Sequence, residues 1–170
     1  MRISFNVHGL KQFLAPRPQR YFLRRVAVVA VVAFLWFRLI MVPAWVSGAS
    51  MEPTYRDGTL LFYLPWLPRL RPPSVGDVVM VRMAGRRVML LKRIVAMAGD
   101  TVEFRGGWLY VNGQRREEPY VEYRYCNWEL AEREVQPGHV YVVGDNRGMP
   151  MDRHYFGRAA RKRIIGYPLW

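Results

Sequence analysis

The chain has 170 residues, 51% of them hydrophobic, and a formal net charge of +13. This composition is too apolar for an intrinsically disordered chain, and the length allows one modest domain with a short appendage. The single cysteine, Cys126, excludes an internal disulfide, and the three histidines are too scattered to indicate a metal site.

The positive charge is concentrated before the most apolar part of the chain. Residues 1–46 carry seven Arg and Lys residues and no acid, whereas residues 47–170 have a net charge of only +6. Nucleic acid is the usual partner of so basic a chain. Bases directly before an apolar segment are better explained as the cytoplasmic flank of a membrane helix. We therefore predict a basic cytoplasmic segment over residues 1–25 and no nucleic-acid partner.

Residues 26–46 form the apolar segment, VAVVAVVAFLWFRLIMVPAWV, with Arg38 as its one charge. The segment is long enough to cross a bilayer as a helix, and Pro43 would end or kink that helix near its outer end. The alternatives are a cleavable secretory signal, for which the run is long, and a buried core helix, which is seldom apolar on every face in so small a protein. We predict one transmembrane anchor over residues 26–46, with everything after it outside the cytoplasm.

The rest of the chain, residues 47–170, alternates short apolar runs with turn signals such as Pro72-Pro73 and Asn112-Gly113. This pattern favours a mainly β fold, an antiparallel β-sheet domain preceded by the one N-terminal transmembrane helix. Around Gly106-Gly107 two runs form a plain hairpin pattern. The expected strands are residues 60–64, 77–83, 88–96, 101–105, 108–111, 140–143 and 164–167.

Residues 60–67, LLFYLPWL, are apolar or aromatic except for one proline. Two readings fit these residues equally well: a buried strand, or a surface that dips into the outer leaflet of a membrane. Both readings stay open at the level of sequence.

Two short motifs contain the candidate catalytic residues. Ser50-Met51-Glu52-Pro53-Thr54 follows the apolar segment almost at once, and Lys92-Arg93-Ile94-Val95 comes 42 residues after the serine. Gly99-Asp100 and Gly144-Asp145-Asn146-Arg147 follow in that order. Each motif alone occurs by chance. The set and its order, behind an N-terminal apolar segment, resemble type I signal peptidases over essentially the whole of residues 47–170.

By this resemblance Ser50 matches the family's nucleophile and Lys92 its general base. A serine hydroxyl attacks a peptide carbonyl poorly unless a base takes its proton, and a lysine of ordinary pKa, about 10.4, is protonated at neutral pH. Burial in apolar surroundings lowers that pKa. In strand alternation Lys92 shares a face with Leu90 and Ile94 while Arg93 points away. Without the family pattern, Ser50 would read as a turn serine and Lys92 as a solvated strand lysine.

The resemblance also implies the surroundings of the dyad. The backbone N–H of Ser50 would donate to the oxyanion, and any second donor must come from elsewhere because Gly48 stands where some relatives carry a hydroxyl. Met51 and the apolar residues near Lys92 would wall shallow substrate pockets. Catalysis of this kind needs no metal and no organic cofactor.

The C-terminal motif departs from the family pattern. Many relatives have a serine there whose hydroxyl orients the lysine, but no serine follows Asn146 in this chain. Backbone, water or a tyrosine would then have to orient Lys92. Asp145 is expected to support the loop. Since Lys92 is present, His154 is expected to be structural and not the base.

The resemblance implies cleavage of signal peptides from secretory precursors at the outer face of the plasma (inner) membrane. The enzyme would be a single-pass monomer with a cytoplasmic N-terminus. Its partners would be the precursors and the phospholipid membrane. A specialised peptidase for pilin or conjugation substrates with the same dyad remains open. So does a non-enzymatic, membrane-tethered β binding module in which Ser50-Met51-Glu52-Pro53-Thr54 is only a turn.

Overall fold

The computed structural model of the chain describes residues 20–82, 89–124 and 126–169. The chain divides into two compact units, with the boundary in the sequence between Arg38 and Leu39. Most of the expected basic segment 1–25, the turn at Ala84-Gly85 and the ends of the two strands beside it lie outside the described residues.

Helix α2 (Arg20–Leu39) accounts for the described part of the first unit. Among the described residues, no helix combines the length and the hydropathy needed to cross a membrane. The predicted range 26–46 is wrong as a single helix, because α2 ends at Leu39 and residues 42–45 form strand β1 (Val42–Trp45). An apolar run does not by itself distinguish helix from strand. Pro43 fits β1 because β1 is an edge strand, where a missing N–H is tolerated.

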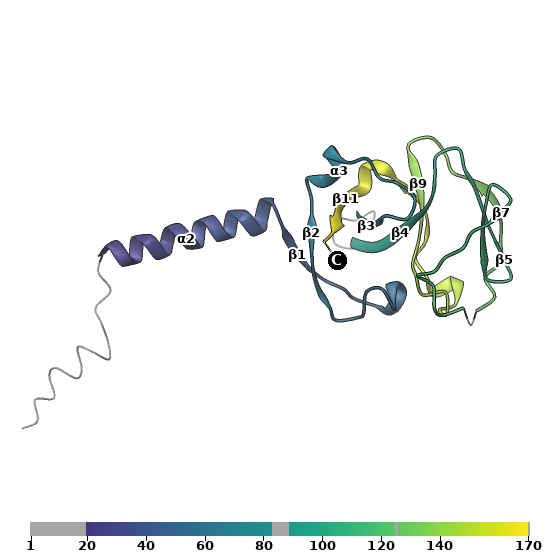
Figure 1. Ribbon diagram of the computed structural model, residues 1–170, viewed down its shortest axis with the longest axis horizontal. Helices are drawn as coiled ribbons and strands as arrows, with labels where there is room; N and C mark the ends of the chain where they lie inside the picture. The colour runs from purple at the N-terminus through teal and green to yellow at the C-terminus, as the bar shows by residue number, and fades with distance from the viewer. Residues whose placement is uncertain (1–19, 83–88, 125, 170) are drawn as a thin grey trace, which may run out of the picture. The chain divides into compact units, whose positions relative to one another are not determined.

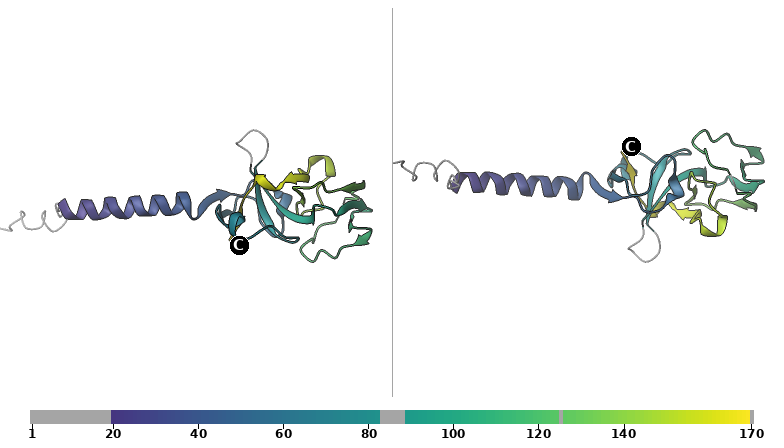
Figure 2. Two further views of the ribbon diagram at one scale, coloured as in Figure 1. Left: turned by 90° about the horizontal axis from the view of Figure 1, so that it is seen from above. Right: turned by 90° about the horizontal axis from the view of Figure 1, so that it is seen from below.

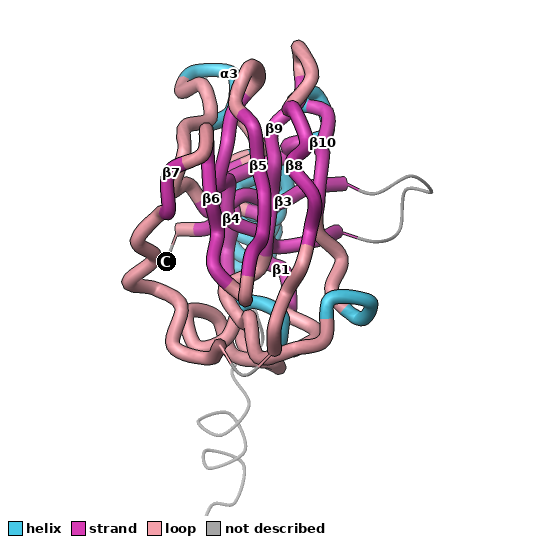
Figure 3. Tube along the Cα trace, turned by 90° about the vertical axis from the view of Figure 1, so that its right-hand side faces the viewer, coloured by secondary structure: helices cyan, strands magenta, loops and turns pink. Residues whose placement is uncertain are grey.

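The second unit consists of two antiparallel sheets (Figures 1 and 3). The larger sheet has the order β1-β2-β11-β3-β4-β9-β10 and the smaller one β7-β6-β5-β8. This arrangement confirms the expected mainly β, antiparallel domain. The larger sheet contains β1, β2 (Leu60–Leu64), β3 (Val78–Arg82), β4 (Met89–Met97), β9 (His139–Val143), β10 (Gly157–Ala160) and β11 (Ile164–Pro168). The smaller contains β5 (Thr101–Arg105), β6 (Trp108–Val111), β7 (Gln114–Arg115) and β8 (Leu130–Glu134).

Short helical turns complete the unit: α3 (Leu67–Leu70), η1 (Ala49–Met51), η2 (Met151–Arg153) and η3 (Arg161–Arg163). The C-terminal strand β11 lies between β2 and β3, so the end of the chain returns to the strands that follow the helix (Figure 2). The predicted hairpin is confirmed, with β5 and β6 paired across Gly106-Gly107.

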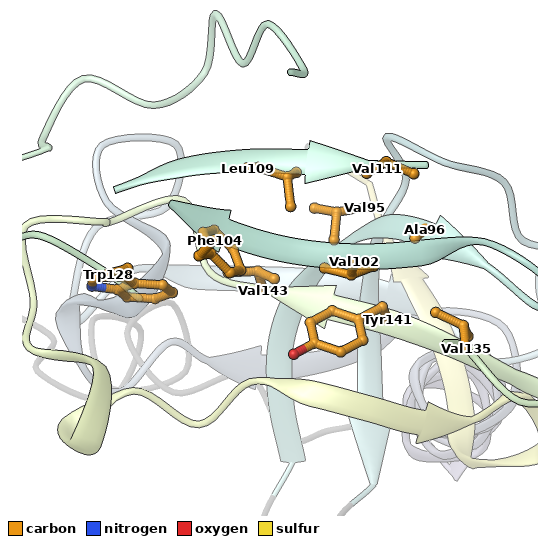
Figure 4. Close-up of a cluster of buried hydrophobic side chains, with 10 residues drawn as sticks. All are labelled: Val95, Ala96, Val102, Phe104, Leu109, Val111, Trp128, Val135, Tyr141 and Val143. Atoms are coloured by element: carbon orange, nitrogen blue, oxygen red, sulfur yellow. The ribbon is translucent and has the colours of Figure 1, made fainter. Parts of the chain in front are cut away.

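The main core lies between the two sheets (Figure 4). Phe104 of β5 packs edge-on against Trp128, with ring centroids 5.3 Å apart. Alternate residues of β5 and β6 face β4 and β9, which is how sheets bury one side each. The buried members of this cluster are Val95, Ala96, Val102, Phe104, Leu109, Val111, Trp128, Val135, Tyr141 and Val143.

A separate apolar cluster includes the buried side of β2. Leu61 and Tyr63 are buried with Val46 and Met80, whereas Leu60 is exposed. Residues 60–64 are therefore a strand with one buried side. Contact of this region with an outer leaflet stays a prediction.

Candidate active site

Ser50 lies in η1, the turn that joins β1 to β2. Gly48 enters the turn with φ +93°, a conformation that side chains rarely adopt, and its N–H donates to Asp57 Oδ1 at 2.8 Å. On the far side of the turn, the N–H of Tyr55 donates to the carbonyl of Met51 at 2.9 Å. The turn is thus closed on both sides of the serine.

Lys92 lies in the middle of β4, opposite Val79 of β3. Its side chain is only 1% exposed. Arg93 points the other way and contacts different groups, as strand alternation predicts. Lys92 Nζ lies 2.5 Å from Ser50 Oγ. The structure therefore brings together the two residues that the sequence motifs single out.

Burial lowers the pKa of Lys92 from 10.5 to about 8, and the Asp145 carboxylate opposes this by favouring the ammonium. At a pKa of 8, roughly a tenth of the Lys92 side chains are neutral at pH 7, against fewer than about one in a thousand for an ordinary lysine. The neutral amine can accept the proton of the Ser50 hydroxyl. The pair has the geometry and the protonation needed for a nucleophile and its general base.

The buried Asp145 carboxylate joins the segments that carry this pair. It accepts hydrogen bonds from Arg93 Nε at 2.9 Å and Nη2 at 2.6 Å, and from Thr54 Oγ1 at 2.6 Å. Thr54 follows Ser50 in the turn, and Arg93 is next to Lys92 in β4. Because Arg93 neutralises Asp145 at short range, the carboxylate stabilises the Lys92 ammonium less than an unpaired one would. The sequence predicted a supporting role for Asp145 but not its partners.

Asn146 fixes the backbone on both sides of the Ser50 Cα. Its N–H donates to the Ser50 carbonyl at 3.1 Å, and its Nδ2 donates to the Ala49 carbonyl at 3.0 Å. Its Oδ1 accepts the N–H of Gly148 at 3.0 Å. Two of these hydrogen bonds attach the loop after β9 to the nucleophile turn, and the third closes the loop itself.

Arg147 and Glu118 form a buried ion pair that sequence reasoning missed. Both side chains are 1% exposed, and Arg147 Nη1 and Nη2 donate to the two Glu118 oxygens at 2.9 and 2.5 Å. Arg147 Nε also donates to the Gly144 carbonyl at 3.0 Å. Glu118 follows a run of polar and charged residues, QRRE, that is typical of a solvated loop, so no local signal distinguishes it.

A small pocket of about 60 Å³ opens beside Ser50. An apolar cavity of about 150 Å³ holds a benzene ring, so a pocket of this size suits a smaller side chain. Met51 forms part of its wall, and its remaining wall is mostly apolar. The lining residues are Ala44, Trp45, Val46, Ser47, Gly48, Ser50, Met51, Leu61, Met80, Met89, Leu90 and Leu91.

Among the described residues, no three His, Cys, Asp or Glu side chains converge as metal ligands. Cys126 is a free thiol whose Sγ lies 3.1 Å from the Gly148 carbonyl.

Comparison with known proteins gives a consistent match. The family model described as signal peptidase, peptidase S26, matches residues 19–169. Signal peptidase I of Bacillus licheniformis is 30% identical over 84% of this chain and 82% of the relative. A probable signal peptidase I-1 of Synechocystis sp. is 30% identical over 84% and 76%. A solved structure of a signal peptidase I from Enterococcus faecalis V583 has a TM-score of 0.47 at 24% identity, over 57% of this chain and 97% of that chain.

The substitution Asp145→Asn tests whether this carboxylate holds β4 and the nucleophile turn together through Arg93 and Thr54. The variant leaves the Arg93 guanidinium without its carboxylate, and breaking a buried ion pair in this way is expected to lower the free energy of unfolding by about 3 kcal/mol. Urea denaturation of the detergent-solubilised chain measures it.

The matched control is Asp77→Asn, which removes the ion pair with Arg71, a side chain that is 54% exposed. Exposed pairs contribute at most about 1 kcal/mol. Equal losses in the two variants would contradict the joining role of Asp145.

Proposed function

The chain belongs to the signal peptidase family, peptidase S26, and from this premise we propose that Ser50 and Lys92 are the nucleophile and general base with which it cleaves signal peptides from secretory precursors. The observation that carries the assignment is the 2.5 Å hydrogen bond between Lys92 Nζ and Ser50 Oγ. The lowered pKa of Lys92, about 8, supports it because a base must be partly neutral at working pH.

In the first half of the reaction, neutral Lys92 takes the proton of Ser50 Oγ as that oxygen attacks the scissile carbonyl. The backbone N–H of Ser50 donates to the oxyanion that develops on the carbonyl oxygen. The Lys92 ammonium then protonates the leaving amine as the peptide C–N bond breaks. The products of this half are the mature protein, released with a free amino terminus, and an acyl-enzyme on Ser50.

In the second half, the same lysine acts as a base toward water. Neutral Lys92 takes a proton from a water that attacks the ester, and the ammonium returns that proton to Ser50 Oγ as the ester bond breaks. The signal peptide leaves with a carboxylate. No metal or organic cofactor takes part in these steps.

We assign the pocket beside Ser50 to the small side chain that precedes the cut. Its volume, about 60 Å³, and its mostly apolar wall support this assignment. Met51, buried in the same wall, is then a specificity residue. The precursor would bind as an extended strand along the adjoining strands, so that backbone hydrogen bonds place the scissile carbonyl at Ser50.

We further propose that α2 attaches the protein to the plasma (inner) membrane, with a cytoplasmic N-terminus and an extracytoplasmic peptidase domain. Its middle, from Val26 to Phe37, has no charged residue, and the helix is about 30 Å long at 1.5 Å per residue. Arg24 and Arg25 precede that stretch, as on the cytoplasmic side of membrane helices. We expect a monomer to suffice for this activity, since one chain supplies Ser50, Lys92 and the pocket.

Cleavage of a secretory precursor by detergent-solubilised protein tests the dyad. The wild type is expected to cut after a small residue, and Ser50→Ala and Lys92→Ala are each expected to lose at least about 1,000-fold in kcat/KM, because the chemical step needs both groups. Circular dichroism checks that each variant keeps its fold.

Equal cleavage by all three proteins would contradict the dyad. An inactive wild type would instead favour a membrane-tethered binding module. Cleavage restricted to pilin or conjugation precursors, with the same dependence on Ser50, would assign a specialised peptidase.

Met51→Ala tests the pocket. The shorter side chain enlarges the pocket. Precursors with valine before the cut should therefore gain about tenfold in kcat/KM relative to those with alanine. Met97→Ala, at the far end of β4 and outside the pocket, is the matched control and should leave that ratio unchanged. The assignment fails if both variants keep the wild-type ratio.

Val31→Lys tests the attachment. A lysine near the centre of a membrane helix costs about 3 kcal/mol of insertion free energy, so the variant should be released from membranes by alkaline carbonate more readily than the wild type. Val31→Ala is the control. Equal retention of all three proteins in the membrane pellet, or their equal release, would argue against attachment through α2.

A further inference from the structure

The excess positive charge of the second unit is concentrated near the end of the chain. Residues 47–170 have a net charge of +6, and residues 153–170 alone carry five Arg and Lys residues and no acid. None of these five cations belongs to the dyad or lines the pocket beside Ser50. The reaction described above therefore does not account for this charge.

Three of these cations line one hollow of the surface. The hollow has a volume of about 440 Å³, and ligand pockets commonly measure about 300–1,000 Å³. Its lining residues are Gln136, His139, Arg158, Ala160, Lys162 and Arg163, and no Asp or Glu is among them. The hollow thus has a wall of one sign of charge.

The backbone builds this hollow at one edge of the larger sheet. Its cations come from the edge strand β10 and from η3, which follows β10 directly (Figure 3). Ala160 pairs with His139 of β9, and Arg158, two positions earlier in β10, lies on the same side of the sheet. The N–H of Arg161 donates to the carbonyl of Gly138 at 2.9 Å. This hydrogen bond ties η3 to the turn before β9, so hydrogen-bonded segments carry the wall.

The three cations have no carboxylate to neutralise them. Within the described part of the chain, no Asp or Glu oxygen lies within ion-pair distance of Arg158, Lys162 or Arg163. All three side chains belong to exposed residues. Like charges around a concave surface repel each other, and the concave shape concentrates their field in the space that they enclose. An anion in the hollow would relieve this repulsion.

The chemistry of the wall favours phosphate over carboxylate. A carboxylate has one negative charge and would balance one of the three cations, whereas a phosphate monoester carries about 1.5 to 2 negative charges at pH 7. An Arg guanidinium presents a planar fork of N–H donors that fits two phosphate oxygens, and Lys adds a point charge. The Gln136 amide can donate a further hydrogen bond. The hollow has room for a phosphate and the group that carries it.

We propose that the hollow formed by β10, η3 and the turn before β9 is a binding site for a dianionic phosphate group, with Arg158 and Arg163 as donors to its oxygens and Lys162 as a third cation. The phosphate is that of a lipid headgroup or of a free phosphate compound. The site lies outside the catalytic machinery, so this proposal goes beyond the proposed function and does not rest on it.

Calorimetric titration of the detergent-solubilised chain with inorganic pyrophosphate tests the site. Pyrophosphate should bind, and acetate at the same ionic strength should bind at least about tenfold more weakly because it has one charge. The triple variant Arg158→Gln/Lys162→Gln/Arg163→Gln should lose at least about tenfold in affinity for pyrophosphate. A wild type that does not bind pyrophosphate, or that binds acetate equally well, would overturn the proposal.

The matched control is Arg69→Gln/Arg82→Gln/Arg116→Gln, which removes three exposed cations outside the hollow. It lowers the net charge by the same amount, so any general attraction of anions to this basic chain falls equally in both variants. The control should keep the wild-type affinity, and both variants should keep the wild-type urea midpoint because the replaced side chains are exposed. Equal affinities of the two triple variants for pyrophosphate would contradict a site in the hollow.

Detergent micelles distinguish the two sources of phosphate. Micelles that contain phosphatidic acid present the phosphate monoester on a lipid, and micelles that contain phosphatidylcholine serve as the zwitterionic control. Displacement of pyrophosphate by phosphatidic acid alone would support the site and assign it to a headgroup. Pyrophosphate binding that neither lipid displaces would support the site and assign it to a free phosphate compound.

A measurement on the unmutated chain locates the bound probe. In ¹⁵N-lysine-labelled protein, the side-chain signal of Lys162, assigned with Lys162→Gln, should shift as pyrophosphate is added. The signal of Lys92, which is 1% exposed, should not shift. An unchanged Lys162 signal would overturn the proposal. None of these measurements uses a precursor, so their outcome is independent of whether Ser50 and Lys92 cleave one.

Discussion

The Asp145 carboxylate is the interaction on which the geometry of the site depends. Thr54 from the nucleophile turn and Arg93 from β4 both bind it, so one buried group fixes the distance between Ser50 and Lys92. Its neighbour Asn146 holds the Ser50 backbone from the same loop. The loop after β9 therefore holds the nucleophile turn and β4 in a fixed relation. Strand β9, which leads into this loop, is anchored by the core between the two sheets.

The site contains four cations, Arg93, Arg124, Arg147 and Lys92, and two carboxylates, Asp145 and Glu118. Arg93 pairs with Asp145, and both Arg147 and Arg124 pair with Glu118. In the part of the chain that the structure describes, Lys92 is the one of these four that has no carboxylate within ion-pair distance. Burial is the reason the pKa of Lys92 lies near 8, and the Asp145 carboxylate, already paired with Arg93, only partly opposes that shift. The Arg93 guanidinium also stacks on Tyr120, 3.9 Å from the ring centre, whose hydroxyl donates to Glu118. These ion pairs are thus parts of one network around the amine.

The sequence predicts correctly those strands whose bounds are set by their own residues and the turns beside them. Strands β2, β5 and β6 have the predicted bounds because each is a short apolar or alternating run between turn residues. Alternation also separated Lys92 from Arg93 correctly. The sequence predicts helix at β1 because β1 continues an apolar run. Only its pairing with β2, which the local sequence does not show, makes it a strand. Strand β8 was missed since only Leu130 is shielded in it. The Glu118–Arg147 pair joins residues 29 apart and leaves no local signal.

The most direct test of the account is the pKa of Lys92 itself. The chain has only three lysines, Lys11, Lys92 and Lys162, so ¹⁵N-lysine labelling gives few signals, and Lys92→Met assigns the one that matters. Lys162 is exposed and serves as an internal reference. The account predicts that Lys92 titrates near pH 8, together with the acid limb of kcat/KM. A Lys92 signal that titrates near the ordinary lysine value of about 10.4 would contradict it.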